Sequence, residues 1–303
     1  YKTEHMKNAG PYARLKFAMD YWCALWFWPI DKADLLPTRS EFLFDMSLIL
    51  EGTTKSVLVT DTATDKKNIH GQISMFPTEM QKIEAEILDL YSGIGEVDIP
   101  VLKKQNPRLD LVAQIAKQNK FMHWELEFAD LFAEHGGFDL MIGNPPWIRL
   151  EWNEQNLLSD LNPMFAVKNL TANQTIKHRE GALNNSSSCY AYFSEYESIS
   201  GEQSFLNAFV NYPHLVGMKA NLYECFLPQA WYCGPECGVS AFVHPDGVFD
   251  DPKGGLLRED LYPRLRKHFQ FTNELRLFSE VDHHTGFSLN IYSNKSTPTF
   301  EAI

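Results

Sequence analysis

The 303-residue sequence has no apolar run long enough to cross a lipid bilayer. Its longest aromatic-rich stretch extends only from Tyr21 to Trp28 and is followed by Pro29. The first residues lack the basic start and the apolar segment of a secretory signal, and position 1 is not methionine. We therefore expect no membrane partner and no secretion, and we expect the chain to be a fragment of a longer protein.

Cysteine is scarce, and its distribution argues against a disulfide-stabilised scaffold. The 5 cysteines are an odd number spread over a large chain, which fits a reducing cytoplasm. Cys233 and Cys237 are the one close pair, and no second pair of metal ligands follows them. We expect a turn there and another at Asp282, His283 and His284, with no metal site at either.

Basic residues are outnumbered by acidic ones. The chain has 27 Lys and Arg against 39 Asp and Glu, and its net charge is -12. Such a protein does not coat nucleic acid by charge alone, since that requires clustered Lys and Arg at the phosphates. Local basic groups remain and leave DNA binding open. Lys168, Lys177 and Arg179 lie in a polar section and are candidate DNA phosphate contacts.

Hydrophobic periodicity changes at about residue 120. The apolar positions between Leu15 and Trp26 follow helical spacing, and Thr38-Arg-Ser-Glu41 is a capping box that predicts a helix to about Leu50. A second capping box at 78–81 predicts another helix. We therefore expect residues 1–120 to form a mainly helical segment.

Residues 121–303 show strand and helix patterns in alternation. Strands are predicted at 121–128, 138–142, 239–243, 274–278 and 287–292, and helices at 221–227 and at 255–269 despite Pro263. This order favours an α/β sheet in which 138–142 is a parallel strand buried on both faces. A polar section at about 148–212 fits neither period and is predicted to be a long functional or mobile insertion.

One corner of the chain carries the strongest chemical signal. The apolar strand at 138–142 runs into Asn144-Pro-Pro-Trp147. Ligands of open α/β sheets bind at the carboxyl ends of the strands, which is where these four residues emerge. Proline has a fixed φ and no N–H, so the two prolines hold the Asn144 amide and the adjacent carbonyls in one orientation.

This corner has the groups that amino methylation of a nucleobase requires. An amide oxygen and a backbone carbonyl can together accept both hydrogens of an exocyclic amine and so localise the nitrogen lone pair. The Trp147 ring offers a flat face on which a planar base can stack. A carboxylate is not essential, because the proton can leave after the transfer. The chemistry requires an exposed Asn144 with space for a purine beside the indole.

The same residues resemble a known catalytic motif. FDLMIGNPPW, at 138–147, is similar to the motif of the amino-type DNA methyltransferases, in which Asn, Asp or Ser and then Pro-Pro and an aromatic residue follow a buried strand. Segments 221–227, 237–249, 257–261 and 287–292 resemble the helix, strand, helix and late strand that come next in that family. Residues 123–128 resemble the large methylases of fused type II restriction-modification and related phage-defence systems. The resemblance covers roughly residues 121–292.

The resemblance implies a fold, a reaction and partners. It implies the catalytic part of a class I methyltransferase domain over 121–303, with a partial Rossmann-like sheet after the helical segment. It also implies transfer of a methyl group from S-adenosylmethionine to the N6 amine of a flipped adenine in double-stranded DNA. Other restriction or defence subunits are implied as further partners. Asn144, Pro145, Pro146 and Trp147 are the implied catalytic residues, and Asn144 is also expected to face the cofactor.

One part that the resemblance leads us to expect is missing. Members of the family have a glycine-rich loop that holds the methionine part of the cofactor, and nothing in residues 1–137 matches it. We expect this loop to precede the chain in the complete protein, in which case the chain alone binds the cofactor poorly. Asp130 is a candidate contact to the cofactor adenine, and an ordinary surface carboxylate is the alternative for this residue.

Other interpretations of the corner stay open. A simple strand-ending turn explains Asn-Pro-Pro-Trp without chemistry, since Asn and Pro are common turn residues. Related Asn-Pro-Pro motifs occur in ribosomal RNA methyltransferases and in protein glutamine methyltransferases, and N4 of cytosine is an alternative DNA target. The missing loop also fits a non-catalytic DNA-binding or scaffold fragment of a defence complex.

Overall fold

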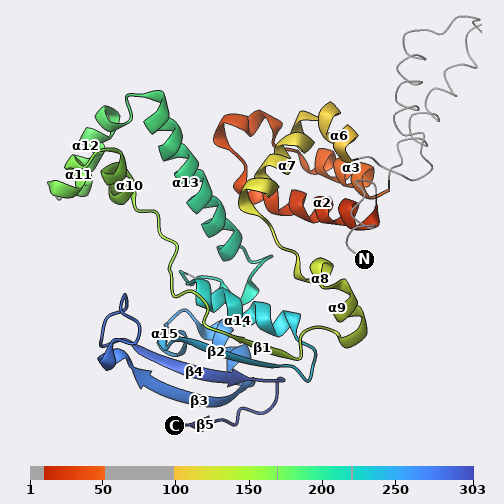
Figure 1. Ribbon diagram of the computed structural model, residues 1–303, viewed down its shortest axis with the longest axis vertical. Coiled ribbons are helices and arrows are strands. Elements are labelled where there is room, and N and C mark those ends of the chain that lie inside the picture. The colour runs from red at the N-terminus through yellow and green to blue at the C-terminus, as the bar shows by residue number, and fades with distance from the viewer. Residues whose placement is uncertain (1–9, 52–98, 169, 220) are drawn as a thin grey trace, which may run out of the picture. The chain divides into compact units, whose positions relative to one another are not determined.

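The structure is a computed structural model that describes residues 10–51, 99–168, 170–219 and 221–303. The chain divides into two compact units, unit 1 at Tyr1–Leu126 and unit 2 at Glu127–Ile303 (Figure 1). The described part of unit 1 is helical, whereas unit 2 combines helices with a five-stranded sheet. Within the described ranges, no helix is long and apolar enough to cross a membrane.

Unit 1 is an assembly of helices and short 3-10 turns. They are α2 (Pro11–Ala24), η1 (Leu25–Phe27), η2 (Ile30–Leu35), α3 (Arg39–Leu50), α6 (Ile99–Gln105) and α7 (Pro107–Asn119), with α8 (Trp124–Glu127) at the boundary with unit 2. The helix predicted between Leu15 and Trp26 is confirmed. The capping box of α3 is confirmed as well, because the Thr38 side chain accepts from the Glu41 backbone and Glu41 accepts from the Thr38 backbone. The capping box at 78–81 lies outside the described residues.

The apolar sides of α2, α3 and α7 form the core of unit 1. Tyr21 on α2, Ile49 on α3, and Leu109 and Val112 on α7 are completely buried. Tyr21 and Phe42 also meet edge to face, with ring centroids 5.1 Å apart. Burial of a side chain of this size stabilises the fold by roughly 1.5 to 3 kcal/mol.

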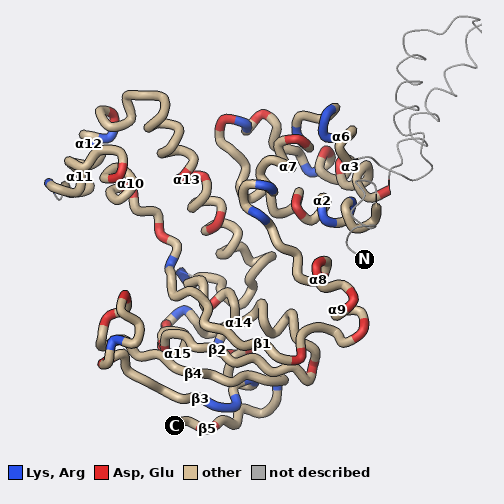
Figure 2. Tube along the Cα trace, in the orientation of Figure 1, with Lys and Arg blue, Asp and Glu red and all other residues tan. Residues whose placement is uncertain are grey.

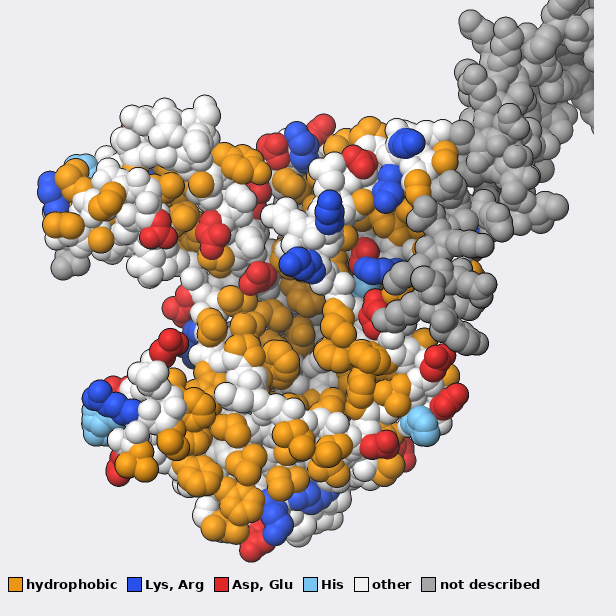
Figure 3. Space-filling model, in the orientation of Figure 1, with side chains coloured by type: hydrophobic (Ala, Val, Ile, Leu, Met, Phe, Trp, Pro, Cys, Tyr) orange, Lys and Arg blue, Asp and Glu red, His pale blue; other side chains and the backbone are white. Residues whose placement is uncertain are grey.

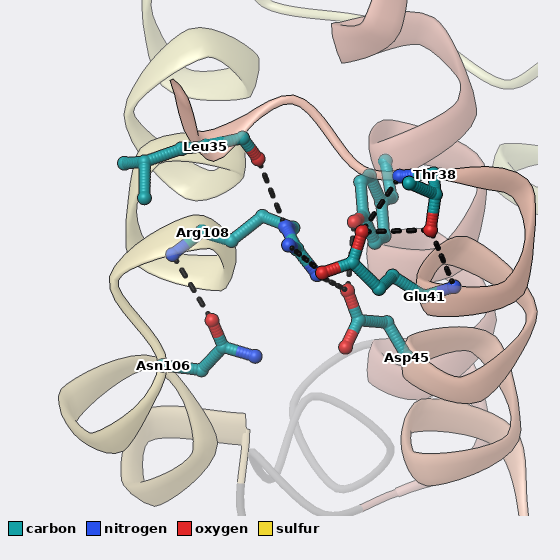
Figure 4. A network of polar contacts seen from close by, with 7 residues as sticks. Leu35, Thr38, Glu41, Asp45, Asn106 and Arg108 are labelled. Carbon is teal, nitrogen blue, oxygen red and sulfur yellow. Dashed lines mark hydrogen bonds and ion pairs between the residues drawn. The ribbon is translucent and has the colours of Figure 1, made fainter. Parts of the chain in front are cut away.

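A polar network centred on Arg108 joins four elements of unit 1 (Figure 4). The Arg108 guanidinium donates to the Leu35 carbonyl at 2.9 Å, to Glu41 at 2.8 Å and to Asp45 at 3.2 Å. Asp45 also accepts a hydrogen bond from the Tyr21 hydroxyl at 2.8 Å. Asp45 is only 2% exposed. A carboxylate this deeply buried requires a charged partner, so Arg108 connects α7 to α3 and to the end of η2.

The strand predicted at 121–128 is wrong. Residues Trp124–Glu127 form the helical turn α8, which begins with a hydrogen bond from the Leu126 N–H to the His123 carbonyl. The apolar alternation is misleading because Met122 and Trp124 are largely exposed, whereas His123 is buried. The His123 Nε2 lies 2.8 Å from Asp20, and this buried polar pair fixes the segment in place of a strand partner.

The sheet of unit 2 is mixed. Its strands are β1 (Leu140–Gly143), β2 (Val239–Pro245), β3 (Leu265–Thr272), β4 (Gly286–Tyr292) and β5 (Glu301–Ala302), in the spatial order β1-β2-β4-β3-β5. β1 pairs parallel with β2, β5 pairs parallel with β3, and β4 is antiparallel to both of its neighbours. The strands predicted at 239–243 and 287–292 are confirmed. The whole is a mixed α/β structure that is compatible with a methyltransferase fold.

β1 is an edge strand in the described part of the sheet, with Gly143 aligned with Phe242 of β2. The prediction that this strand is buried on both faces is wrong, since Leu140 is 58% and Ile142 is 74% exposed. A short apolar run cannot by itself distinguish an edge strand from a central one. The turn before β1 requires glycine, because Gly137 has a φ of 136° and a Cβ there would lie 2.1 Å from the Cys233 carbonyl oxygen.

Helices cover one face of the sheet. They are η3 (Pro213–Leu215), α14 (Leu222–Cys233), α15 (Gly247–Asp250) and α16 (Gly255–Leu261). Their buried side chains, such as Leu227, Val248 and Leu257, pack with Phe242 and Tyr292 of the sheet to form the core of unit 2. The helix predicted at 221–227 is confirmed and is longer than expected. α9 (Ala129–His135) leads into the turn before β1.

Two predictions after Gly255 are wrong. The helix predicted to reach residue 269 ends at Leu261, and residues Leu265–Thr272 are strand β3. Pro263 explains the difference, because it has no N–H to continue a helix and its ring clashes with the preceding turn. The strand predicted at 274–278 is instead the short 3-10 helix η4 (Asn273–Leu275).

The polar section at about 148–212 is helical and not an irregular loop. It contains α10 (Glu154–Leu161), α11 (Met164–Val167), α12 (Ala172–Ala182) and α13 (Ser186–Asn207), which project from the sheet in Figure 1. α13 is long, yet Gly201 is its only buried residue. A helix with so little buried surface has no apolar stripe, so its period is hidden in the sequence.

Candidate active site

The Asn144 corner lies directly after β1, at the end where β1 and β2 both finish (Figure 1). The Asn144 side chain is exposed, Pro145 is buried and Pro146 is exposed. In the described part of the chain, no hydrogen bond engages the Asn144 carboxamide. The buried proline holds the corner against the protein, while the amide is left available to a ligand at the carboxyl edge of parallel strands.

Trp147 is anchored beside this amide. Its indole Nε1 donates to the Val243 carbonyl of β2 at 3.3 Å, and the side chain is half-buried. The indole ring centroid lies 4.5 Å from that of Phe278, at an interplanar angle of 48°, and 5.8 Å from that of Phe287. The corner therefore includes a cluster of three aromatic rings. Sequence analysis missed the role of Phe278, because the pattern around it predicted a strand.

The backbone after Trp147 is tied to the start of α14. The Leu222 N–H donates to the Ile148 carbonyl at 2.9 Å, and Arg149 and Asn221 form an antiparallel bridge. Asn221 opens α14 with a capping box, in which its N–H donates to Glu224 at 2.8 Å. Burial raises the pKa of the Glu224 carboxyl. The segment from Asn144 to Trp147 is thus held by strand β1 on one side and by the bridge between Arg149 and Asn221 on the other.

A buried polar network stiffens β2 next to the corner. Asn290 of β4 donates to the Nε2 of His244 at 3.0 Å and to Ser288 at 2.8 Å, and its amide oxygen accepts from His268 of β3 at 2.7 Å. Ser288 then donates to the Asp246 carboxylate at 2.6 Å. Burial lowers the pKa of His244 to about 4, so this imidazole is neutral at pH 7. The network fixes the carboxyl end of β2, to which Trp147 is bonded.

One cavity lies just after the corner along the chain and does not include it. A hollow of about 600 Å³ is bordered by residues 150–152, by the end of α13 and by residues 217–219. Trp152 and Gln203 both line it, and the Gln203 amide donates to the Leu150 carbonyl at 2.6 Å. Asn144 and Trp147 do not line this hollow. Asn144 is exposed, as expected. Phe278 partly fills the space beside the Trp147 indole, which is where a purine was expected to lie.

Asp130 lies in the first turn of α9 and is exposed. No hydrogen bond or ion pair joins it to Asn144 in the described residues. The described residues before Asn144 contain no strand followed by a glycine-rich loop, since they are helical up to α9. The described residues up to Trp147 include the exposed Asn144 amide and the Asp130 carboxylate, and they do not by themselves complete a site for the methionine part of the cofactor.

The three candidate phosphate contacts have different surroundings. Lys168 follows α11 and Lys177 lies on α12, and both side chains are exposed. Arg179 is paired with the Glu154 carboxylate, with its Nη2 at 2.9 Å, and this pairing raises the pKa of the guanidinium. A phosphate at Arg179 would therefore have to compete with Glu154, whereas the two lysines are available.

The turn at Asp282, His283 and His284 is ordered by local bonds, because the His284 N–H donates to the Asp282 carboxylate at 2.8 Å. Within the residues that the structure describes, no group of three or more His, Cys, Asp or Glu side chains is placed to hold a metal ion.

Comparison with known families gives one match. The model of the Eco57I family, described as Eco57I restriction-modification methylase, matches residues 45–199. This range covers just over half of the chain and includes Asn144-Pro-Pro-Trp147 together with α10 to α12. Among individual curated proteins, none matches the chain.

Proposed function

The chain belongs to the Eco57I restriction-modification methylase family, and from this membership we propose that it transfers a methyl group from S-adenosylmethionine to the N6 amine of adenine in double-stranded DNA. The observation that carries the proposal is the exposed Asn144 carboxamide, which has no hydrogen-bonding partner in the described part of the chain and follows a strand at the carboxyl edge of the sheet.

Asn144 and the backbone beside it would hold the target amine. The Asn144 side-chain oxygen and the Pro145 carbonyl, which follows it in the chain, are acceptors for the two hydrogens of an exocyclic amine. Accepting both hydrogens leaves the nitrogen lone pair directed at the methyl donor and stabilises the positive charge that develops on nitrogen. Pro145 and Pro146 reduce the entropy that the loop loses on binding.

Trp147 and Phe278 would receive the flipped base. An adenine outside the duplex loses its stacking neighbours, and the indole and phenyl rings can replace them. Because the two ring centroids are 4.5 Å apart, the base either packs on the remaining indole face or displaces Phe278. The bond from the indole Nε1 to Val243 keeps Trp147 in place during either event.

S-adenosylmethionine is the proposed donor, and when bound it supplies an electrophilic methyl group. Asp130 is the proposed contact to its adenine, and Asn144 faces it across the amine. Lys168 and Lys177 are proposed phosphate contacts, with Arg179 as a third. Restriction or defence subunits are proposed as further partners.

A methylation assay tests the proposal. The complete protein is incubated with duplex DNA and methyl-labelled S-adenosylmethionine, and the DNA is digested to nucleosides. We expect label in N6-methyl-2′-deoxyadenosine, and we expect sequencing of cellular DNA to find no N6-methyladenine at these sites when the gene is removed. Label in N4-methylcytosine would mean that the target base is cytosine and not adenine. Folded protein that labels no DNA base would contradict the proposal.

Replacement of Trp147 tests the stacking role. We expect Trp147→Ala to raise the Michaelis constant for DNA, because base stacking on an aromatic side chain is worth about 1 to 3 kcal/mol. Trp147→Phe keeps a flat ring and loses only the bond to Val243, so it should have the smaller effect. Steady-state kinetics of both variants, with thermal unfolding as a check on folding, distinguish the two. An unchanged Michaelis constant in Trp147→Ala would exclude stacking.

A further inference from the structure

The helical section α10–α13 presents an unusual surface at α11 and α12, here called the α11–α12 tip and defined by Met164, Val167, Lys168, Ile176 and Lys177. Val167 is 81% exposed, Ile176 54% and Met164 46%. Figure 3 shows hydrophobic side chains next to basic ones at this end of the section. Apolar side chains gathered in water at one place mark a surface that contacts another molecule.

The tip stands on a folded base. Leu158 of α10, Phe165 of α11 and Thr175 of α12 are 0%, 2% and 4% exposed and fill the space between the helices. The Glu154 carboxylate accepts from Arg179 of α12 at 2.9 Å and from the Tyr192 hydroxyl of α13 at 2.6 Å. The exposed side chains are therefore held outward by a preorganised support, and their exposure does not arise from an unfolded segment.

Both charged residues of the tip are basic, and the exposed Glu180 lies one turn further along α12. Lys168 and Lys177 are exposed and, among the described residues, neither forms an ion pair. Figure 2 shows Lys and Arg, with Asp and Glu close by, at the α11–α12 end of the section. The chain has a net charge of -12. Two lysines that lie beside apolar side chains and form no ion pair are nevertheless suited to bind an anionic partner.

We infer that the α11–α12 tip is a wedge that contacts double-stranded DNA, in which Val167 and Ile176 press against a base step while Lys168 and Lys177 contact the flanking phosphates. This inference rests on the proposed function. Apolar side chains that enter between base steps partly unstack them, and basic residues beside them supply the electrostatic attraction. Unstacking at the tip would kink the duplex there and let it contact more of the protein surface.

The test compares matched variants of the complete protein. The double variant V167S/I176S removes the apolar side chains, and K168A/K177A removes the charges. V210S is the control, because Val210 is 63% exposed in the same unit and is outside the tip. Duplex binding is measured by anisotropy at several salt concentrations, and unstacking is measured with a duplex that carries 2-aminopurine.

We expect V167S/I176S to weaken duplex binding about tenfold and to suppress the rise in 2-aminopurine fluorescence, with the salt dependence unchanged. K168A/K177A should instead reduce the slope of log affinity against log salt by about one per lysine. V210S should behave like the wild type. If V167S/I176S binds and unstacks the duplex as well as V210S does, the wedge is wrong. This is also the result expected if the tip contacts a protein and not DNA.

The wedge and the proposed function can fail separately. If the wild type methylates DNA while V167S/I176S binds and unstacks normally, only the wedge is wrong. If the wild type neither binds nor methylates duplex DNA, the proposed function is wrong and the wedge falls with it.

Discussion

Replacement of Asn144 by Ala is expected to lower the rate of DNA methyl transfer by about a hundredfold to a thousandfold, the usual loss when one preorganised hydrogen-bonding group is removed from a reacting centre. The amine would keep one acceptor, the backbone carbonyl, and would lose the orientation of its lone pair. Because the Asn144 side chain is exposed and bonds to no described residue, the change should leave the fold intact.

The measurement is single-turnover methyl transfer at saturating donor, alongside calorimetric titration of the donor. Donor affinity should stay nearly constant in Asn144→Ala, since the lost contact is mainly to the amine. Asn144→Asp keeps an acceptor and should retain part of the rate. Asn184, also an exposed amide in unit 2, provides the control, and Asn184→Ala should be fully active. A fully active Asn144→Ala would remove Asn144 from the catalytic residues.

Replacement of Arg108 by Met is expected to cost unit 1 about 3 to 5 kcal/mol of stability, because it leaves the Asp45 carboxylate buried without a charged partner. Among the described residues, Asp45 would keep only the Tyr21 hydroxyl as a donor. Amide hydrogen exchange of α2, α3 and α7 measures this loss locally and separates it from unit 2.

Two further variants define the cause. Arg39→Met removes an exposed guanidinium from the first position of α3 and should change stability by no more than about 0.5 kcal/mol. The pair Arg108→Met with Asp45→Asn removes both buried charges and should recover much of the loss. Unchanged exchange in Arg108→Met would mean that the network in Figure 4 contributes no net stability.

Local chemistry in the sequence predicted the fold where each element carries its own signal. The capping box at Thr38 and the largely apolar strand at 239–243 are decided by neighbouring residues, and both are found. β1 shows the limit of such reasoning, because its residues predict a strand while its place at an edge depends on which other strands are present. α13 was missed because it buries almost nothing, and a helix without an apolar stripe has no readable period.

The candidate site was predictable only along one stretch of chain. Asn144, Pro145, Pro146 and Trp147 are contiguous, so their order alone indicates a stiff corner after a strand. Phe278 lies 131 residues after Trp147 and reaches it through the loop between β3 and β4. The His244 network likewise joins three strands by register. Contacts of this kind depend on how the strands are arranged in the sheet. The spacing of residues along the chain does not reveal that arrangement.

The bridge between Arg149 and Asn221 has a consequence for how this protein can diversify. The chain leaves the sheet after Arg149 and comes back to it at η3 and at Asn221, so α10 to α12 form an excursion between these attachments. Such an excursion can be lengthened, shortened or exchanged without altering how β1 and β2 align, since its two ends meet regardless of what they enclose. The Asn144 corner can thus stay constant while the length and sequence of α10 to α12 change.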